Sequence, residues 1–404
     1  MPGKFAEKNQ TKKDCHLFLK TGEGKYTKVF SPRTKQNKKC YVLSMDLVTV
    51  QTKACSTLNA SRGERTACFG SFSFTLLFFS NFPQHAHGYA CSGHDGHVAM
   101  LLGAAALLKK VEDQIVGTIR LVFQPAEEGG AGMKRMIEEG LVSMEPKALE
   151  AYGMHVWPTL PTGSIATRSG ALLAAAETFE IQIMGKGGHA AMPHLTIDPI
   201  VAGSALVQNL QTIVSRTLSP LEAGVVSVTQ FTAGDAYNVI PAAATMRGTI
   251  RALSNELLLT LRKQVHDMVT ATALLHGCNS TIRFSPDYYP PTMNDEKLFD
   301  WSKLVGALVS RESVVRDIEP TMGGEDFSFL AQELPSAFML VGQGSGGMDN
   351  EKYHIPRTDY GLHHPSFALD ENVLPIGSEL HTNLALRALK RLSQTDADAA
   401  DVEL

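Results

Sequence analysis

The alternation of helix and strand between residues 98 and 155 limits the possible folds more than any other feature of the chain. Residues 98–110 are strong helix formers that end in two lysines, which suit a helix C-terminus. Residues 117–124 and 148–155 are apolar and β-branched enough for buried strands, with a short helix between them that Gly140 caps. This alternation predicts an α/β fold, with helices packed on both faces of a mainly parallel sheet.

The predicted strands end in side chains that bind metals or accept protons. Glu127 and Glu128 follow the first strand on a glycine-rich turn, and His155 ends the second strand. Ligands of parallel sheets gather beyond the carboxyl ends of the strands, so we expect these residues to share one site. Adjacent residues on a turn point in different directions, so one carboxylate can bind a metal while its neighbour faces the water. A solvated acidic turn is the alternative.

Two further segments add side chains that bind metals. Residues 91–97 read Cys-Ser-Gly-His-Asp-Gly-His, and residues 362–365 read Leu-His-His-Pro. Thiolate and imidazole are favoured ligands of borderline metals such as zinc. Asp95 and His97 are candidates to orient His94 and are assigned no ligand role. Four clusters of this kind, each flanked by glycine or proline, predict a metal-dependent hydrolase.

Length, charge and cysteine content limit the number of domains, the binding partners and the cellular compartment that we expect for this chain. The chain has 404 residues, more than one core of common size, so two domains are expected. A net charge of −4 provides no basic surface for nucleic acid or an anionic membrane. The six cysteines are scattered without a disulfide framework, and the lysine-rich N-terminus lacks the apolar segment of a signal peptide. Both features favour the cytoplasm.

The middle of the chain follows a different order, β-α-β-β-α-β, between about residues 165 and 290. The predicted strands cover 177–184, 225–231, 245–250 and 280–284, and the predicted helices cover 198–217 and 255–275. This order is typical of a ferredoxin-like α+β domain. The domain is inserted between two parts of the α/β block, and the second part holds His363.

Seven segments, in order along the chain, carry a family signature. They cover residues 94–105, 123–129, 153–155, 185–194, 238–241, 323–327 and 362–363. In these segments the chain resembles the dinuclear-metal aminoacylase and carboxypeptidase superfamily. Within it, the resemblance is to the amidohydrolases that cleave N-acyl amino acids, such as hippurate hydrolases and plant auxin-conjugate hydrolases. The similarity extends over about residues 88–391.

The resemblance implies a metal-binding catalytic domain and a smaller inserted lid domain that also forms a homodimer. We expect residues 1–168 and 289–404 to form the catalytic domain and residues 169–288 to form the lid. Residues 1–87 match the family poorly. The cofactors implied are two divalent metal ions per subunit, manganese or zinc.

The resemblance also implies roles for individual residues. By position, the metal ligands are His94, Glu128, His155 and His363. Glu127 matches the catalytic base, and His189 matches a lid residue that stabilises the developing oxyanion in a partner subunit's active site. Asn238 is a candidate contact for the substrate carboxylate, and holding a turn is its alternative role.

The cysteine ligand leaves two alternatives. Family members read Cys-Gly-His, with the cysteine bound to metal, whereas this chain reads Cys91-Ser92-Gly93-His94. Either a shifted loop brings Cys91 to the metal, or Ser92 takes the family position. We favour Cys91, because a thiolate is a far better ligand than a neutral hydroxyl.

The expected activity is hydrolysis of the amide bond of an N-acyl amino acid, such as a hippurate-like, N-acetyl or auxin-conjugate substrate, to a carboxylic acid and an amino acid. A dipeptidase or carboxypeptidase that uses the same site is one alternative. A catalytically impaired, dimeric metal- or ligand-binding protein is the other, because the N-terminal region matches poorly.

Overall fold

The computed structural model shows a mixed α/β fold, as the alternation of helix and strand predicts. It describes residues 16–20, 26–28, 40–47, 65–69, 72–76, 92–344 and 358–402, with side chains in 92–344 and 358–394. Its contacts divide the chain into two compact units. The first unit comprises residues 1–126, 155–164 and 341–404, and the second comprises residues 127–154 and 165–340.

The first unit contains the strand order β3-β6-β1-β2. β3 (Cys40–Leu47) and β1 (His16–Lys20) both pair in parallel with β6 (Thr118–Pro125), and β2 (Tyr26–Lys28) adds an antiparallel edge. All but the last residue of β6 are buried, which explains its continuous apolar pattern. β4 (Arg65–Phe69) and β5 (Phe72–Leu76) form a separate antiparallel pair.

Two helices cover these strands in the first unit. α1 (His94–Lys110) packs on β3 and β6, and α8 (Val373–Val402) packs on α1 and β3. The buried face of α1 includes Met100, Leu101 and Leu108, which are at most 1% exposed. α1 therefore begins four residues earlier than the predicted helix, at His94 itself.

The second unit contains the strand order β17-β8-β18-β7. These strands are β17 (Val315–Asp317), β8 (Ile165–Thr167), β18 (Ser336–Gly342) and β7 (Ala148–Trp157). The last two residues of β18 and the last three of β7 belong to the first unit. The second unit also holds α2 (Glu127–Gly130), α3 (Gly132–Glu138), α6 (Glu296–Val309), α7 (Phe327–Glu333) and the antiparallel pair β9 (Gly170–Leu173) and β16 (Thr292–Asn294).

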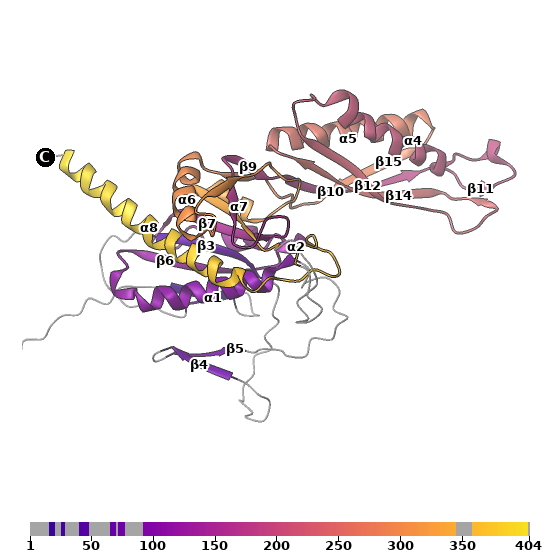
Figure 1. Cartoon of the computed structure of the whole chain (residues 1–404). Coiled ribbons are helices and arrows are strands. Elements are labelled where there is room, and N and C mark those ends of the chain that lie inside the picture. Colours follow the sequence, from indigo (N-terminus) through magenta and orange to yellow (C-terminus); the bar gives the residue numbers. More distant parts are fainter. Residues whose placement is uncertain are drawn as a thin grey trace, which may run out of the picture. The chain divides into compact units, whose positions relative to one another are not determined.

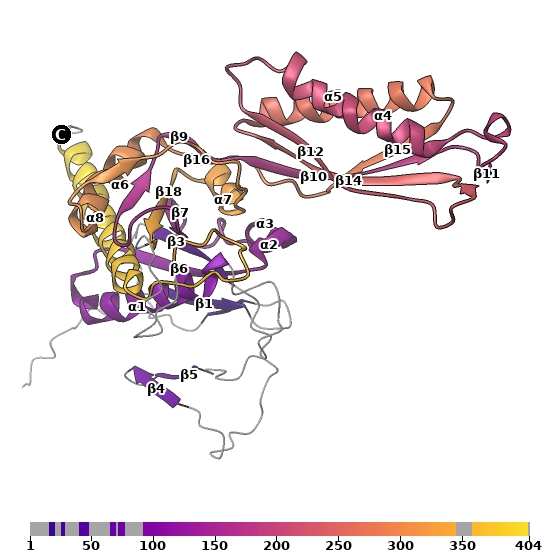
Figure 2. The ribbon, with the colours of Figure 1, turned by 45° about the vertical axis from the view of Figure 1, so that its right-hand side comes forward.

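Residues 175–284 of the second unit form an α+β subdomain in the predicted order (Figures 1 and 2). Its elements are β10 (Ala175–Met184), α4 (Pro199–Thr212), β12 (Gly224–Ala233), β14 (Ala243–Ala252), α5 (Asn255–Leu275) and β15 (Asn279–Phe284). The antiparallel sheet has the order β12-β14-β10-β15, and both helices lie on one face of it. This arrangement is ferredoxin-like.

The core of this subdomain follows from its sequence pattern. Phe179, Ile181 and Ile183 alternate along β10 and are at most 3% exposed, and they pack with buried leucines of α4 and α5. Asp198 and Ser254 cap the two helices by accepting hydrogen bonds from main-chain N–H groups of the first turns. The predicted domain boundaries at residues 168 and 288 and the role of the insertion as a lid stay predictions. Within the described residues, the helices fall short of the length and apolar character that a membrane crossing requires.

Candidate active site

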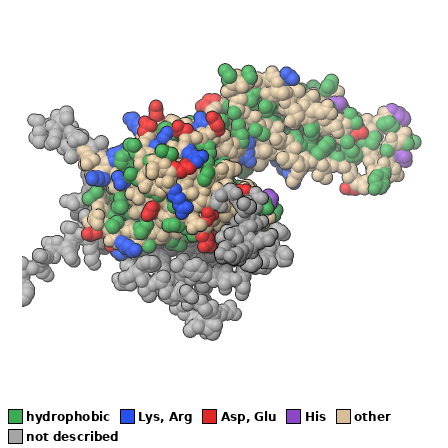
Figure 3. Space-filling view, viewed as in Figure 1, with side chains coloured by type: hydrophobic (Ala, Val, Ile, Leu, Met, Phe, Trp, Pro, Cys, Tyr) green, Lys and Arg blue, Asp and Glu red, His purple; other side chains and the backbone are tan. Residues whose placement is uncertain are grey.

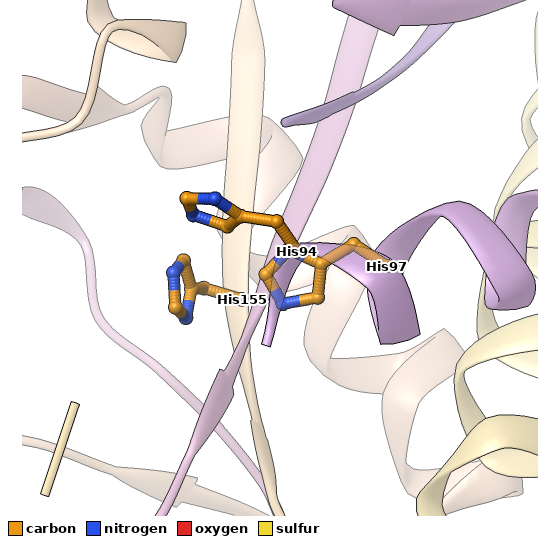
Figure 4. Close-up of side chains that lie close together, drawn as sticks. All are labelled: His94, His97 and His155. Atoms are coloured by element: carbon orange, nitrogen blue, oxygen red, sulfur yellow. The ribbon is translucent and has the colours of Figure 1, made fainter. Parts of the chain in front are cut away.

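Three imidazoles converge in the first unit (Figure 4). His94 and His97 lie three residues apart on α1 and therefore share one helix face, and His155 lies on β7. The ring centres of His94 and His97 are 5.7 Å apart, and that of His155 is 5.7 Å from His94 and 4.5 Å from His97. One nitrogen of each ring lies within 4.8 Å of the others. All three rings are buried.

Gly93 allows α1 to begin so close to the end of β7. Its φ of +83° lies in the left-handed region, which is unfavourable for residues with a Cβ atom. A Cβ atom at this position would lie 2.4 Å from Cγ2 of Val156, the residue that follows His155. The Gly-His sequence at 93–94 is therefore a steric requirement of the imidazole cluster.

Hydrogen bonds to Val156 distinguish two of the imidazoles. Nδ1 of His155 lies 2.7 Å from the carbonyl oxygen of Val156. A carbonyl only accepts, so this Nδ1 carries the proton and Nε2 carries the lone pair that can bind a metal. Nε2 of His97 accepts the main-chain N–H of Val156 at 2.9 Å, so its lone pair is already used. His97 thus supports the strand beside His155, and the chemistry favours His94 and His155 as metal donors.

Burial keeps two of these imidazoles, those of His94 and His97, neutral. Burial, together with the nearby His363, lowers the pKa of His94 to about 4. Burial also lowers the pKa of His97 well below its ordinary value. A neutral imidazole is the form that binds a metal, so this donor set fits a divalent ion.

The structure describes one of the two other predicted ligands of the first unit, His363, but not Cys91. His363 is exposed, has a left-handed φ of +64° and lies close enough to His94 to affect its pKa. The structure therefore brings His363 into the neighbourhood of the cluster. Cys91 lies outside the described residues, and the neighbouring Ser92 is 1% exposed.

Glu127 and Glu128 belong to the second unit and lie on a turn, as predicted. The segment is labelled α2, but Glu128 has a ψ of 72° and Gly129 a φ of +81°, so its backbone is not helical. Glu127 is half-buried and Glu128 is exposed. The two adjacent carboxylates therefore have different environments, as expected if one acts as a base and the other binds a metal.

Tyr289 holds this turn and was not found by the sequence reasoning. Its hydroxyl donates to the carbonyl oxygen of Glu127 and accepts from the main-chain N–H groups of Gly129 and Ala131, at 3.0 and 3.2 Å. Burial raises the pKa of Tyr289, so the hydroxyl stays protonated and remains a donor. No local motif marks this residue, which lies 162 positions from Glu127.

His189 and Asn238 come together on a small ribbon at the end of the subdomain. β11 (Gly188–His189) pairs with β13 (Val239–Ile240), and the N–H of Ala190 donates to the carbonyl oxygen of Asn238 at 2.9 Å. Histidine side chains gather at this tip (Figure 3), and both His189 and Asn238 are exposed. The structure thus groups the two predicted substrate-contacting residues, although 49 positions separate them.

A second residue that the sequence reasoning missed is His381 of α8. Its side chain is fully buried, and burial lowers its pKa to about 3. Neither ring nitrogen has a hydrogen-bond partner among the described residues. His381 also contributes to the lowered pKa of His97, so the two buried imidazoles are neighbours. A histidine in an apolar helix carries no sequence signal of such a position.

The α/β fold and the buried imidazole cluster fit a metal-dependent enzyme. The comparison with known sequences makes this specific. Residues 80–387 match Peptidase family M20/M25/M40, and the chain belongs to this family.

Individual relatives and solved structures agree with this assignment. The chain is 42% identical over 317 residues to the IAA-amino acid hydrolase ILR1-like 4 of Arabidopsis thaliana, covering 78% of this chain and 69% of that protein. It is 35% identical to the N-acetylcysteine deacetylase of Bacillus subtilis, over 75% of each chain. A dinuclear metal-binding peptidase of Bacillus subtilis has a similar structure, with a TM-score of 0.65, 25% identity and coverage of 93% of this chain and 88% of that chain.

Proposed function

We propose that this chain hydrolyses the amide bond of N-acyl amino acids and releases a carboxylic acid and an amino acid. The observation that carries this proposal is the buried pair of imidazoles, His94 and His155, in a chain 42% identical to an IAA-amino acid hydrolase. The N-acetylcysteine deacetylase among the relatives supports the same substrate class, because its name also describes removal of an acyl group from an amino acid.

Two divalent ions, manganese or zinc, are the proposed cofactors. The residues that would hold them are Cys91, His94, Glu128, His155 and His363. When bound, such ions lower the pKa of water and polarise a carbonyl oxygen. The Nδ1 bond of His155 to the Val156 carbonyl fixes the tautomer that presents Nε2, and His97 holds the same residue from its N–H side.

Glu127 is the proposed general base. It takes a proton from the attacking water and returns it to the leaving nitrogen, so that the amide C–N bond breaks as a neutral amine leaves. Its half-buried carboxylate, on a turn held by Tyr289, supports this role over that of a solvated surface acid. Glu128 differs in backbone conformation and exposure, which supports a separate role as a ligand.

The 175–284 subdomain is the proposed lid and dimerisation domain of a cytoplasmic homodimer. His189 is proposed to donate a hydrogen bond to the developing oxyanion in the partner subunit's site, and Asn238 to contact the substrate carboxylate. Their shared position on an exposed ribbon supports a common target. The His189 side chain is exposed, so its ring is accessible to a group outside its own subdomain.

A substrate panel tests the activity. Purified protein with added Mn²⁺, Co²⁺ or Zn²⁺ should release benzoate from hippurate or acetate from N-acetyl amino acids. Dipeptides belong in the panel because the thermostable carboxypeptidase 1 of Saccharolobus solfataricus is 37% identical over 301 residues. Cleavage of dipeptides alone would replace the proposed substrate class, and no cleavage of any member would overturn the proposed function.

Two substitutions separate the roles of the adjacent glutamates. Glu127→Gln should abolish turnover and leave bound metal nearly unchanged, because only the base is lost. Glu128→Gln should lower bound metal as well. Metal content measured beside turnover distinguishes the two, and near-normal turnover of Glu127→Gln would show that another group is the base.

A second pair of substitutions tests the cysteine ligand. Cys91→Ala should lower metal affinity, and bound metal should protect Cys91 from alkylation, because the thiolate would be coordinated. Ser92→Ala should change metal affinity little. The reverse pattern would assign the ligand position to Ser92.

A further inference from the structure

The Tyr289 hydroxyl uses its full hydrogen-bonding capacity on the turn that carries Glu127. A phenolic hydroxyl has one proton to donate and two lone pairs to accept with. Tyr289 donates to the carbonyl oxygen of Glu127, and it accepts from Gly129 at 3.0 Å and from Ala131 at 3.2 Å. All three partners lie within five residues of one another, so one side chain fixes the whole turn.

The turn needs such support because its backbone is held in unfavourable conformations. Ala126 and Ala131 have φ angles of +58° and +48°, and Gly129 has one of +81°. Left-handed alanines are disfavoured by about 1–2 kcal/mol each, and such residues persist only where the surroundings determine them. Oδ2 of Asp326 extends the support by accepting the N–H of Met133 at 3.1 Å, at the start of α3.

Tyr289 is itself fixed in place. Its main chain exchanges two hydrogen bonds with Ala176, at 2.8 and 2.9 Å, at the beginning of the long strand β10. Its ring meets Phe329 edge to face, with centroids 5.8 Å apart, and the side chain is 8% exposed. The hydroxyl therefore has a defined position from which it can set the position of its partners.

We propose that Tyr289 is the positioning residue of the catalytic base: its hydroxyl sets the backbone of the Glu127 turn, and thereby the direction of the Glu127 carboxylate, without touching substrate. This inference rests on the proposed function for its catalytic consequence. The control of the turn itself does not depend on that function. Positional errors of about 1 Å in a reacting group reduce rates by up to about 100-fold, so this support affects catalysis directly.

The test compares Tyr289→Phe with Tyr288→Phe in the full-length, metal-loaded protein. Tyr288 is the adjacent tyrosine, is partly buried, and its side chain packs against the core of the 175–284 subdomain. Each substitution removes one oxygen atom and keeps the ring. For each variant, kcat and KM, bound metal, Tm, and amide hydrogen exchange at Gly129 and Ala131 are measured.

Tyr289→Phe should lower kcat by about 10- to 100-fold with KM within about twofold, because the base is displaced and substrate binding is not. Exchange at Gly129 and Ala131 should be at least about tenfold faster, since both N–H groups lose their acceptor. Tm should equal that of Tyr288→Phe, and bound metal should fall no further than in Glu128→Gln, because Glu128 lies on the same turn. Tyr288→Phe should match the wild type in kcat and exchange.

Two results would overturn the inference. One is equal kcat and equal exchange in the two variants. The other is a loss of kcat that accompanies a Tm below that of Tyr288→Phe, which would indicate a general structural role. A wild type that cleaves no substrate in the panel would refute the proposed function. Exchange at Gly129 and Ala131 would then still decide whether the hydroxyl holds the turn.

Discussion

The imidazole cluster of the first unit and the ribbon at the tip of the 175–284 subdomain present histidine in opposite ways. His94, His97 and His155 are at most 9% exposed and are fixed by helix geometry and by main-chain bonds. His189 is exposed, and the one side-chain bond that the structure gives it is local, from the N–H of Ala191 to Nδ1 at 3.1 Å. The cluster is formed by its own unit, whereas the ribbon offers its imidazole outward.

This difference shows which property of each histidine the fold controls. Burial lowers the pKa of His94 and His97, so the fold itself selects the neutral, metal-binding form. At His189 the fold controls only the direction in which the side chain is presented. Substitutions in the cluster should therefore change metal binding and stability, and substitutions on the ribbon should change turnover alone.

The largest effect is expected for the cluster. His155→Ala should remove bound metal and lower turnover by at least about 100-fold, because a donor and its fixed tautomer are both lost. His364→Ala is the control, since that exposed ring stacks on Tyr360, with ring centroids 4.4 Å apart, and lies outside the proposed ligand set. Metal analysis after dialysis measures the difference, and full metal content in His155→Ala would remove this residue from the ligand set.

The ribbon should give a large effect of a different kind. His189→Ala should lower kcat by about 100-fold, as loss of one oxyanion donor does, with bound metal and Tm unchanged. His194→Ala is the matched control, because His194 is an exposed histidine in the neighbouring short helix Pro193–Leu195. Loss of metal in His189→Ala would show that the ribbon, like the imidazole cluster, affects metal binding.

Mixing of inactive variants tests whether His189 acts across subunits. A mixture of His189→Ala and Glu127→Gln should recover up to about a quarter of wild-type activity, because half of the dimers would be mixed and each would hold one complete site. Differential tags confirm that subunits exchange. Exchange without any recovery would place His189 on its own subunit's site or outside catalysis.

Glycine substitutions should give an intermediate effect on stability. Gly93→Ala should lower the free energy of unfolding by about 2–4 kcal/mol, because it adds a contact of 2.4 Å with Val156 to the strain of a left-handed alanine. Gly129→Ala meets no atom within 4 Å and should lower it by about 1 kcal/mol from backbone strain alone. Denaturant titration gives both values, and equal losses would show that the close approach of α1 to β7 is unimportant.

The effect that is smallest at neutral pH concerns acid stability, because it appears only as the pH falls below about 6.5. The pKa of His381 is about 3 when folded and about 6.5 when unfolded, so the unfolded chain binds the proton first as the pH falls. Stability is full above about pH 6.5 and falls by up to about 1.4 kcal/mol per pH unit toward pH 3. His381→Leu should remove the contribution of one proton taken up on unfolding, which lowers this slope by up to about 1.4 kcal/mol per pH unit. An unchanged slope between pH 4 and 6 would show that His381 takes no proton on unfolding.

Local patterns predicted the elements of this fold well. β6 (Thr118–Pro125) and α5 (Asn255–Leu275) match their predicted ranges to within one residue, because continuous apolar runs and helix caps are properties of short segments. The β-α-β-β-α-β order and its sheet pairing also agree with the prediction. The predicted roles of the site residues stay predictions, although the structure places His363 near His94 and His189 beside Asn238.

What the sequence could not show depends on contacts between distant segments. Tyr289 meets its turn across 162 positions, and the Nε2 atom of His97 meets Val156 across 59. Neither contact corresponds to a periodic pattern or a motif spacing that could be recognised in the sequence. The sequence did indicate that His97 was a supporting residue, but not that it would support β7 through a main-chain N–H group.

The length of β10 has a mechanical consequence. Eight residue steps of about 3.3 Å separate Ala176, which is bonded to Tyr289, from Met184 at the end that leads to the His189 ribbon, a length of about 26 Å. Over this length, a rotation of about 7° at one end would displace the other end by about 3 Å, which is the length of one hydrogen bond. The same tyrosine holds the Glu127 turn, so one residue joins the start of the strand that leads to the His189 ribbon and the turn of the proposed base.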